Sequence, residues 1–178
     1  MNDRVLFRGV RDGKTFMVAG MEFIKFPDRD GKTAVAAKNV MFYSAFGSNN
    51  DLRKSPVFVR LKEKVLPKII EAVGEENVLS FETDLTAWDG LKDYGTLESK
   101  ISLPTMDFYR ANVEIFDQRK SDWWWLATPE TTATHGNDRW VLCVSPSGIL
   151  SGDRCSNGSY GVRPFCIFKS SIFGSFEE

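Results

Sequence analysis

The sequence predicts one α+β domain over residues 1–178, because strand-like runs occur near both ends and helix-like spacing occurs between them. Three consecutive tryptophans, Trp123, Trp124 and Trp125, begin the C-terminal third. In a strand, Trp123 and Trp125 face one side and Trp124 the other, which predicts a strand that is covered on both faces. The length suits a single domain with a sizeable core, and no internal repeat or linker divides the chain.

The N-terminal part, residues 1–43, has the pattern of β structure. Short apolar or alternating runs occupy 15–19, 21–26 and 33–37, and glycines or turn residues separate them. The last two runs predict a hairpin around the segment 27–31. Asp28 and Asp30 resemble the start of a calcium loop, but the closing glutamate is missing, so an ordinary turn is the expectation.

A helix is predicted after Ser55, which can cap it, with Pro56 at the first helical position. Apolar residues then recur at helical spacing as far as Gly74, which should end the helix. Pro67 should either kink this helix or begin a second one. The basic residues of 53–68 alternate with glutamates, which indicates an ordinary solvated face.

The segment 77–100 has little periodicity and predicts a long ordered loop anchored by Trp88. A second main helix is expected after Pro104, with Thr105 as its cap. The C-terminal third predicts strands at 139–144, 149–150 and 162–168. The two intervening stretches are rich in Gly, Ser, Asn and Asp, so they are expected to be exposed loops.

Composition limits the functional classes. The formal net charge of -1 provides no basic field for nucleic acid, and no apolar run is long enough for membrane insertion. The first eight residues lack the apolar core of a signal peptide, which predicts cytoplasmic synthesis and leaves virion or cell-surface association open. Cys143, Cys155 and Cys166 form no C-x-x-C pair, so buried thiols are expected rather than disulfides.

Two motifs of the C-terminal third resemble a family of uncharacterised bacterial and phage domains. The family pattern W-W-L-R-S-P corresponds to residues 124–129, and its G-V-R-P corresponds to residues 161–164. The resemblance implies a C-type lectin-like fold, with two main helices and a twisted antiparallel sheet that supports a loop-rich C-terminal binding face. The sequence departs from the pattern at Ala127 and Thr128, where the family has Arg-Ser. Arg163 is expected to be structural, fixing carbonyls or a carboxylate beneath the tryptophan strand.

The same fold displays the variable proteins of diversity-generating retroelements, in which adenines of a C-terminal repeat are randomised. Such randomisation does not produce Lys, Glu, Gln, Met or Trp from asparagine codons. Residues 131–168 contain no Lys, Glu, Gln or Met, and Trp140 is the one residue of the excluded types. Turn-rich segments favour Gly, Asn, Ser and Asp for backbone reasons as well, so a constant binding domain of the same fold remains an alternative.

The function predicted from these features is a non-enzymatic module that binds a protein or cell-surface ligand through 131–139 and 151–160, with no cofactor and no metal. The supporting residues are Trp123, Trp124, Trp125 and Arg163. Tyr160 and Trp140 are the predicted anchors of the ligand. The full set of candidate ligand-binding residues is Thr132, Thr134, His135, Asn137, Asp138, Arg139, Trp140, Ser151, Asp153, Arg154, Ser156, Asn157, Ser159 and Tyr160.

Two other functions remain open. The first is a phage-encoded intracellular effector or inhibitor that binds a host protein through a fixed surface, for example the basic helix at 53–68. The second is an oxidase that resembles formylglycine-generating enzymes. The lone His135 and the three cysteines match no usual zinc spacing, and the cysteines lack the sequence context of that oxidase site.

Overall fold

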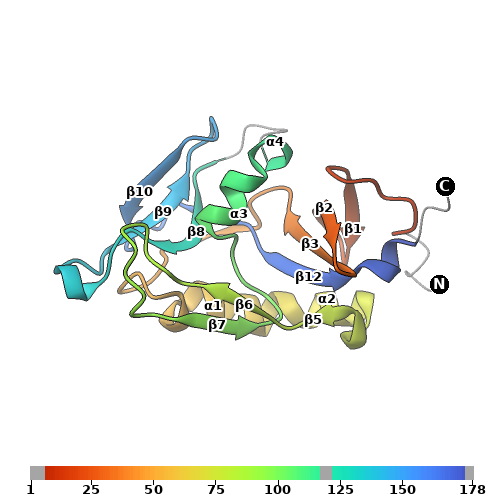
Figure 1. Ribbon diagram of the computed structural model, residues 1–178, viewed down its shortest axis with the longest axis horizontal. Helices are drawn as coiled ribbons and strands as arrows, with labels where there is room; N and C mark the ends of the chain where they lie inside the picture. Colours follow the sequence, from red (N-terminus) through yellow and green to blue (C-terminus); the bar gives the residue numbers. More distant parts are fainter. Residues whose placement is uncertain (1–6, 117–121, 175–178) are drawn as a thin grey trace.

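The computed structural model describes residues 7–116 and 122–174, and these residues form a mixed α+β structure with twisted antiparallel sheets (Figure 1). The strands are β1 (Thr15–Val18), β2 (Met21–Arg29), β3 (Lys32–Ala37), β4 (Phe42–Tyr43), β5 (Val78–Leu79), β6 (Phe81–Asp84), β7 (Thr96–Ser99), β8 (Trp124–Pro129), β9 (Trp140–Val144), β10 (Leu150–Arg154), β11 (Gly161–Val162) and β12 (Phe165–Lys169). The helices are α1 (Pro56–Arg60), α2 (Leu66–Val73), α3 (Met106–Ala111) and α4 (Val113–Phe116), with short helical turns elsewhere.

The strands form two larger sheets and one small hairpin within the described residues. The first sheet has the order β1-β2-β3-β12-β5, the second has the order β10-β9-β8-β11-β4, and β6 pairs with β7. The predicted strand at 162–168 is therefore wrong as one element, because β11 joins the second sheet and β12 joins the first. Arg163 and Pro164 lie at the crossing. Proline lacks an N–H to donate to a ladder and restricts the preceding residue, which favours a change of pairing partner at this point.

The predicted hairpin at the N-terminal end is confirmed. β2 and β3 are antiparallel and are joined by Asp30 and Gly31, which both have positive φ (50° and 72°). Such a two-residue turn matches the right-handed twist of the strands. The Asp28 carboxylate accepts hydrogen bonds from Lys25 (3.0 Å) and Thr33 (2.5 Å). Among the described residues no group of three or more His, Cys, Asp or Glu side chains is placed to hold a metal ion.

The predicted helix at 55–73 is confirmed in its limits. The Ser55 hydroxyl accepts a hydrogen bond from the Val57 N–H (3.1 Å), and Gly74, with φ 93°, ends the helix. Between α1 and α2 the segment 61–65 is π-helical. Pro67 has no N–H to donate and its ring crowds the preceding turn, which accounts for the local widening. The three segments form the main helix of the structure.

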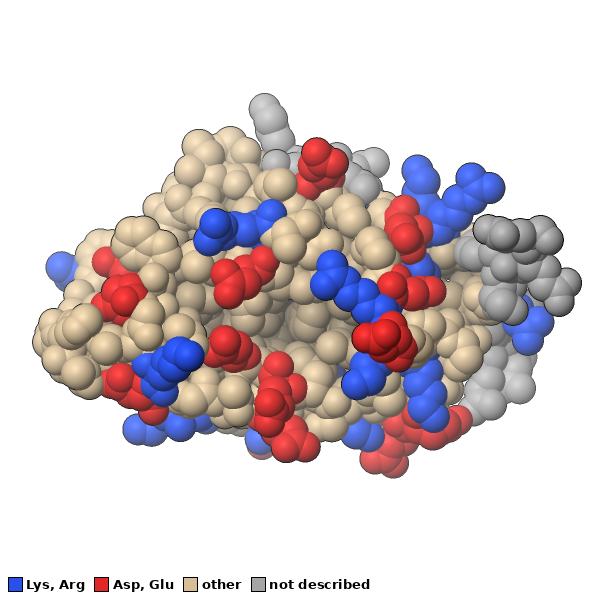
Figure 2. All heavy atoms as spheres, in the orientation of Figure 1, with Lys and Arg blue, Asp and Glu red and all other residues tan. Residues whose placement is uncertain are grey.

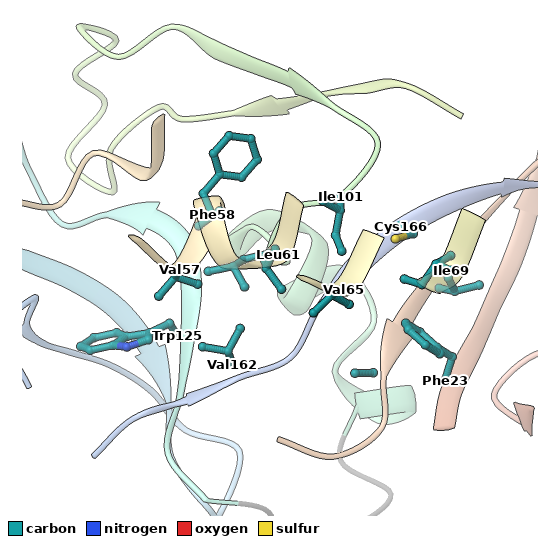
Figure 3. Close-up of a cluster of buried hydrophobic side chains, with 14 of the residues drawn as sticks. Phe23, Val57, Phe58, Leu61, Val65, Ile69, Ile101, Trp125, Val162 and Cys166 are labelled. Atoms are coloured by element: carbon teal, nitrogen blue, oxygen red, sulfur yellow. The ribbon is translucent and has the colours of Figure 1, made fainter. Parts of the chain in front are cut away.

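This helix packs against both larger sheets, so it joins them into one core (Figure 3). Val57 and Leu61 lie over Trp125 and Val162 of the second sheet, whereas Ile69 lies over Phe23 of the first. All of these side chains are fully buried. Burying one such side chain stabilises the fold by roughly 1.5–3 kcal/mol, so the helix contributes strongly to holding the two sheets together.

The prediction of two main helices is wrong. Thr105 does cap α3, since its hydroxyl accepts from the Phe108 N–H (3.1 Å), but α3 ends at Ala111 and α4 is a separate single turn. Asn112 interrupts the helix with φ -131° and ψ 24°, and its side chain donates to the Phe108 carbonyl (2.9 Å). Asparagine favours such local bonds over a continuous helix, which explains the break.

The predicted long loop at 77–100 is also corrected. It contains β5, β6 and β7, and only residues 85–95 remain a loop. Trp88 does not anchor this loop, because its side chain is 62% exposed. Backbone bonds hold the loop instead: the Trp88 N–H donates to the Pro129 carbonyl (2.9 Å), and the Leu85 N–H donates to the Gly95 carbonyl (3.0 Å).

Acidic and basic side chains are interspersed over the face seen in Figure 2, with no large region of one sign. This distribution agrees with the small net charge. Within 7–116 and 122–174, none of the helices has the length and apolar character needed to cross a membrane. The expectation of no signal peptide concerns a segment whose first six residues lie outside the described residues.

Candidate functional site

The tryptophan strand β8 is covered on both faces, as the sequence predicts. Trp124 packs against Tyr109 (ring centroids 5.7 Å apart) on the side of α3 and α4. Trp125 stacks on Tyr160 (4.2 Å) on the opposite face, and its indole N–H donates to the Ser44 carbonyl (2.9 Å). Both tryptophans are buried, and the indole N–H of Trp125 has a hydrogen-bond acceptor. β8 therefore gives the neighbouring loops a rigid base.

Trp123 differs from the other two tryptophans. It precedes β8, is 39% exposed, and touches Tyr160 with its ring (5.7 Å). Trp123 and Trp125 therefore share a face, as the alternation of a strand predicts, but Trp123 lies at the rim. The sequence assigns Trp123 to the structural residues; in the described part of the chain its ring contacts Tyr160 while part of the side chain is exposed.

Arg163 is the buried structural arginine that the sequence predicts. It is 2% exposed, its Nε donates to the Ala37 carbonyl (2.8 Å), and its guanidinium lies 4.5 Å from the centre of the Trp124 ring. Thr128, where the sequence departs from the W-W-L-R-S-P pattern, also has a role. Its hydroxyl accepts a hydrogen bond from the Met106 N–H (2.9 Å), so it caps the start of α3.

A buried asparagine connects three segments at the end of the second sheet. The Asn50 amide donates to the carbonyls of Thr131 (2.7 Å) and Trp140 (2.9 Å), and its oxygen accepts from the Tyr94 hydroxyl (2.7 Å). Its backbone N–H donates to the Asp138 carbonyl (2.8 Å). Asn50 is fully buried, so these bonds fix both ends of the 131–140 segment without using any side chain of that segment.

Two aspartates of the 85–95 loop hold the first candidate residues. Asp93 accepts from Thr132 (2.6 Å) and Thr134 (2.5 Å), and these hydrogen bonds lower the pKa of its carboxyl. Asp89 accepts from the Thr131 hydroxyl and lies 2.7 Å from Nδ1 of His135, and the Thr131 bond contributes most to lowering its pKa. Thr132 is buried by this contact, so it supports the surface and is not exposed to a ligand.

A hollow of about 380 Å³ opens where three segments of the chain meet. We call it the arginine hollow; its lining residues are Gly47, Ser48, Asn137, Arg139, Trp140, Arg154, Cys155 and Ser156. Five of the candidate residues thus come together, from two stretches that are separated in sequence. The predicted anchor Trp140 is half-buried at its wall, while Arg139, Arg154 and Ser156 are exposed.

The two arginines of this hollow are held differently. Nη1 of Arg139 donates to the Ser48 carbonyl (2.9 Å), and its Nε lies 3.2 Å from the Asp138 carboxylate. The Arg154 guanidinium makes no hydrogen bond within the described part of the chain, and Arg154 is exposed. One guanidinium is therefore oriented by the protein, and the other has its donors directed to solvent.

The remaining candidate residues do not form a loop as predicted. Ser151, Asp153 and Arg154 lie on β10, an edge strand paired with β9, because the short return predicted at 149–150 continues to Arg154. Beyond the strand, the Asn157 amide donates to Asp153 (3.0 Å) and its oxygen accepts from the Ser159 hydroxyl (2.6 Å). This turn is held by its own side chains.

Tyr160 is a support and not an exposed anchor. It is 6% exposed, because its ring lies against Trp125 and Trp123. Burial raises the pKa of Tyr160, and its hydrogen bond to Asp153 raises it further. The sequence pattern did not indicate this burial, since the stacking partner is 35 positions away in the chain and belongs to another strand.

The three cysteines are free and buried. Burial raises the pKa of Cys143 to about 11 and also raises the pKa values of Cys155 and Cys166. A thiol with a raised pKa is a poor nucleophile at neutral pH. The geometry therefore adds nothing in favour of the oxidase alternative.

Sequence reasoning did not identify Asn50, Asp89 or Asp93 as residues of the site. Asn50 and Asp51 stand just before the predicted helix, and Asp89 and Asp93 stand in the segment without periodicity. Their acidic and amide side chains are typical of turns, so no local signal distinguishes a residue that supports a distant loop from an ordinary turn residue.

Comparison with known proteins assigns the chain to a family without giving it a function. Residues 80–170 match the family described as a domain of unknown function (DUF6273). The match covers just over half of the 178 residues, so the chain belongs to this family. It includes every strand from β6 to β12, and it contains Asp89, Asp93 and both arginines of the hollow. No curated protein and no solved structure matches the chain.

Proposed function

We propose that this DUF6273 protein is a non-enzymatic binding module that presents the arginine hollow to a protein or cell-surface ligand. The observation that carries the proposal is the convergence of residues 47–48, 137–140 and 154–156 on one hollow, with two arginines and one half-buried tryptophan in its lining. Arginine and tryptophan are the residue types enriched among the strongest contacts of protein interfaces.

The backbone around the hollow is held independently of its exposed side chains. The Cys155 N–H donates to the Arg139 carbonyl (2.7 Å), and the Cys155 carbonyl accepts from the Phe46 N–H (2.8 Å). The Asn50 amide binds two further carbonyls of the 131–140 segment. Hydrogen bonds to backbone groups of the hollow do not depend on which side chains those residues carry. Arg139, Arg154 and Ser156 can therefore vary at little cost to the fold.

This arrangement supports a scaffold with a variable surface. The proposed scaffold is of the C-type lectin-like class, which fits two largely antiparallel sheets joined by one main helix and a polar end rich in loops. Residues 131–168 contain no Lys, Glu, Gln or Met. All lining residues of the arginine hollow except Gly47 and Ser48 belong to this window. Diversification by a retroelement of phage or bacterial origin would change the ligand while keeping Asn50, which lies outside the window.

The chemistry of the hollow favours an acidic ligand group. The Arg154 guanidinium has free donors, and the Arg139 guanidinium in the same lining is already oriented by Ser48 and Asp138. A planar guanidinium binds a carboxylate through two parallel hydrogen bonds, which gives both affinity and orientation. Ser156 and Asn137 add polar groups that adapt to different ligands.

The proposal is tested by comparing two pairs of substitutions in capture experiments with extracts of the organism that carries the gene, and of its host. Arg139→Ala/Arg154→Ala should abolish capture of a partner that the wild-type chain retains. Lys64→Ala/Lys68→Ala, on the exposed face of the main helix, is the matched control and should retain it. The opposite result would favour the fixed-surface effector that binds through the basic helix.

A genomic observation separates a variable surface from a constant one. A nearby reverse transcriptase gene and a template repeat that matches the codons for 131–168 would support retroelement diversification. Identical residues at 137, 139, 154 and 156 in all copies of the gene from related genomes would contradict it and would leave a constant binding module.

A further inference from the structure

A second pocket of about 510 Å³ lies on the α3 side of the second sheet, and it shares no lining residue with the arginine hollow. We call it the α3 pocket. It is bounded by α3, by the strands β9 and β10, and by the 85–95 loop. Its lining residues are Trp88, Met106, Arg110, Glu130, Leu142, Leu150, Ser151 and Gly152.

Two opposite charges line this pocket without neutralising each other. Glu130 is half-buried and Arg110 is exposed. Within the described part of the chain, neither side chain makes a hydrogen bond or an ion pair, either with the other or with a third residue. A partly desolvated carboxylate gains most from a charged hydrogen-bonding partner, so both groups are available to a ligand.

The Glu130 carboxylate lies close to a glycine in the edge strand. A Cβ atom at Gly152 would lie 2.9 Å from Oε2 of Glu130, so a larger residue at this position would make the carboxylate shift. Glycine weakens a strand interior and often marks a close approach of another group. Here it leaves room for the carboxylate directly over β10, opposite Leu142 in the strand register.

The floor and the rim of the pocket are apolar. Leu142 is 7% exposed, Leu150 and Met106 are half-buried, and the Trp88 indole is 62% exposed at the rim. Pockets that bind small molecules combine an apolar lining with a few polar groups that fix orientation. An exposed tryptophan adds apolar contact area and a π-face that attracts a cation.

We propose that the α3 pocket binds a small zwitterion with an apolar body, of the class of short peptides and free amino acids. The ligand's ammonium group would pair with Glu130 beside the Trp88 ring, and its carboxylate would pair with Arg110. Its apolar side chains would lie on Met106, Leu142 and Leu150. A ligand with a single charge leaves one of the two protein groups desolvated without a partner, which weakens its binding.

The first experiment titrates leucyl-leucine and free leucine into the wild-type chain by calorimetry. Tryptophan fluorescence is recorded in parallel, and a change that is absent in Trp88→Phe is assigned to Trp88. N-acetyl leucyl-leucine and leucyl-leucine amide each lack one charge, so each should bind about tenfold or more weakly than the free dipeptide. Tighter binding of free leucine than of the dipeptide would identify an amino acid as the source of the zwitterion. Absence of binding by both, or equal binding of the blocked derivatives, would overturn the proposal.

The second experiment assigns each charge. Glu130→Gln should remove the preference for a free over an acetylated amino group and keep the preference for a free carboxylate, and Arg110→Gln should do the reverse. Lys64→Ala is the control and should keep both preferences. Unchanged preferences in both variants would contradict the assigned contacts. Because Arg139 and Arg154 are absent from this pocket, failure here leaves the capture experiment on the arginine hollow unaffected.

Discussion

The two segments that flank the arginine hollow, residues 131–140 and 151–160, are held in different ways. Distant side chains fix the first: Asn50 binds its carbonyls, and Asp89 and Asp93 bind its threonines and histidine. Backbone pairing with β9, backbone bonds from residues 44–47 and bonds within its own turn fix the second. One surface is thus built from a segment held by distant side chains and a segment held mainly by backbone pairing and by its own turn.

The difference determines which substitutions each segment tolerates. Asn50 binds backbone carbonyls, which every residue provides, so it holds the 131–140 segment whatever side chains are displayed. The bonds of Asp93 require the hydroxyls of Thr132 and Thr134. In the second segment the contact between Asp153 and Tyr160 requires those two side chains. The support that does not depend on the side chains of these segments therefore comes mainly from Asn50.

The largest effect is expected for Asn50→Ala. The substitution removes the three hydrogen bonds of a fully buried side chain and leaves two carbonyls and the Tyr94 hydroxyl without this partner. We expect a loss of about 3 kcal/mol in the free energy of unfolding, measured by urea denaturation. Asn157→Ala, in the self-supported turn, is the control with an expected loss below about 1 kcal/mol. Equal losses in the two variants would remove the distinction between the segments.

A smaller effect is expected for Tyr160→Phe. The change keeps the ring stacked on Trp125 and removes the hydroxyl that bonds to Asp153, so about 1–2 kcal/mol should be lost. Tyr43→Phe is the matched control, because that hydroxyl is exposed and bonds to an exposed aspartate, and its loss should be much smaller than that of Tyr160→Phe. A loss of the control's size at Tyr160 would mean that the ring alone supports the 151–160 segment.

The local parts of the fold were predictable from the sequence. Ser55, Pro56 and Gly74 set the limits of the main helix by chemistry that acts within a few residues. The cover on both faces of β8 followed from adjacent tryptophans alone. In each case the residues that determine the structure are neighbours in sequence, so periodicity and capping patterns contain the necessary information.

The remaining parts depend on partners far away in the chain. β5 has two residues and is a strand because Val78 pairs with Phe168. The 162–168 segment divides between sheets because β4 and β8 flank β11 whereas β3 and β5 flank β12. For the site, the polar composition of 131–160 indicated exposure correctly for His135, Arg139 and Arg154, but not for Tyr160, whose burial depends on Trp125.

The support of the 131–140 segment by aspartates should depend on pH. Hydrogen bonds from Thr132 and Thr134 lower the pKa of Asp93 below the ordinary value of 3.8. A carboxyl with a lowered folded-state pKa stabilises the structure above its unfolded pKa, and this contribution is lost as the pH falls through the folded-state value. The amides of Thr134 and His135, which donate to the Thr132 hydroxyl and carbonyl, should therefore lose protection from hydrogen exchange below about pH 4.

Asp93→Asn removes the Asp93 titration and leaves that of Asp89, so the amides of Thr134 and His135 should lose less protection between pH 5 and pH 3 than in the wild-type chain. Amides of β10 serve as the internal reference, since they are held by pairing with β9 and should not follow Asp93 in either protein. A fall in protection at β10 that parallels the fall at Thr134 would show that the two segments open together.

The smallest effect on stability is expected where the effect on binding should be largest. Arg139 and Arg154 are exposed, and the one hydrogen bond from Arg139 to the Ser48 carbonyl lies at the surface. Exposed polar contacts of this kind contribute little, so Arg139→Ala/Arg154→Ala should change the free energy of unfolding by less than about 0.5 kcal/mol. Urea denaturation of the variant measures this directly. A loss above about 2 kcal/mol would show that the arginines hold the segments together, and a surface whose displayed residues also maintain the fold could not vary freely.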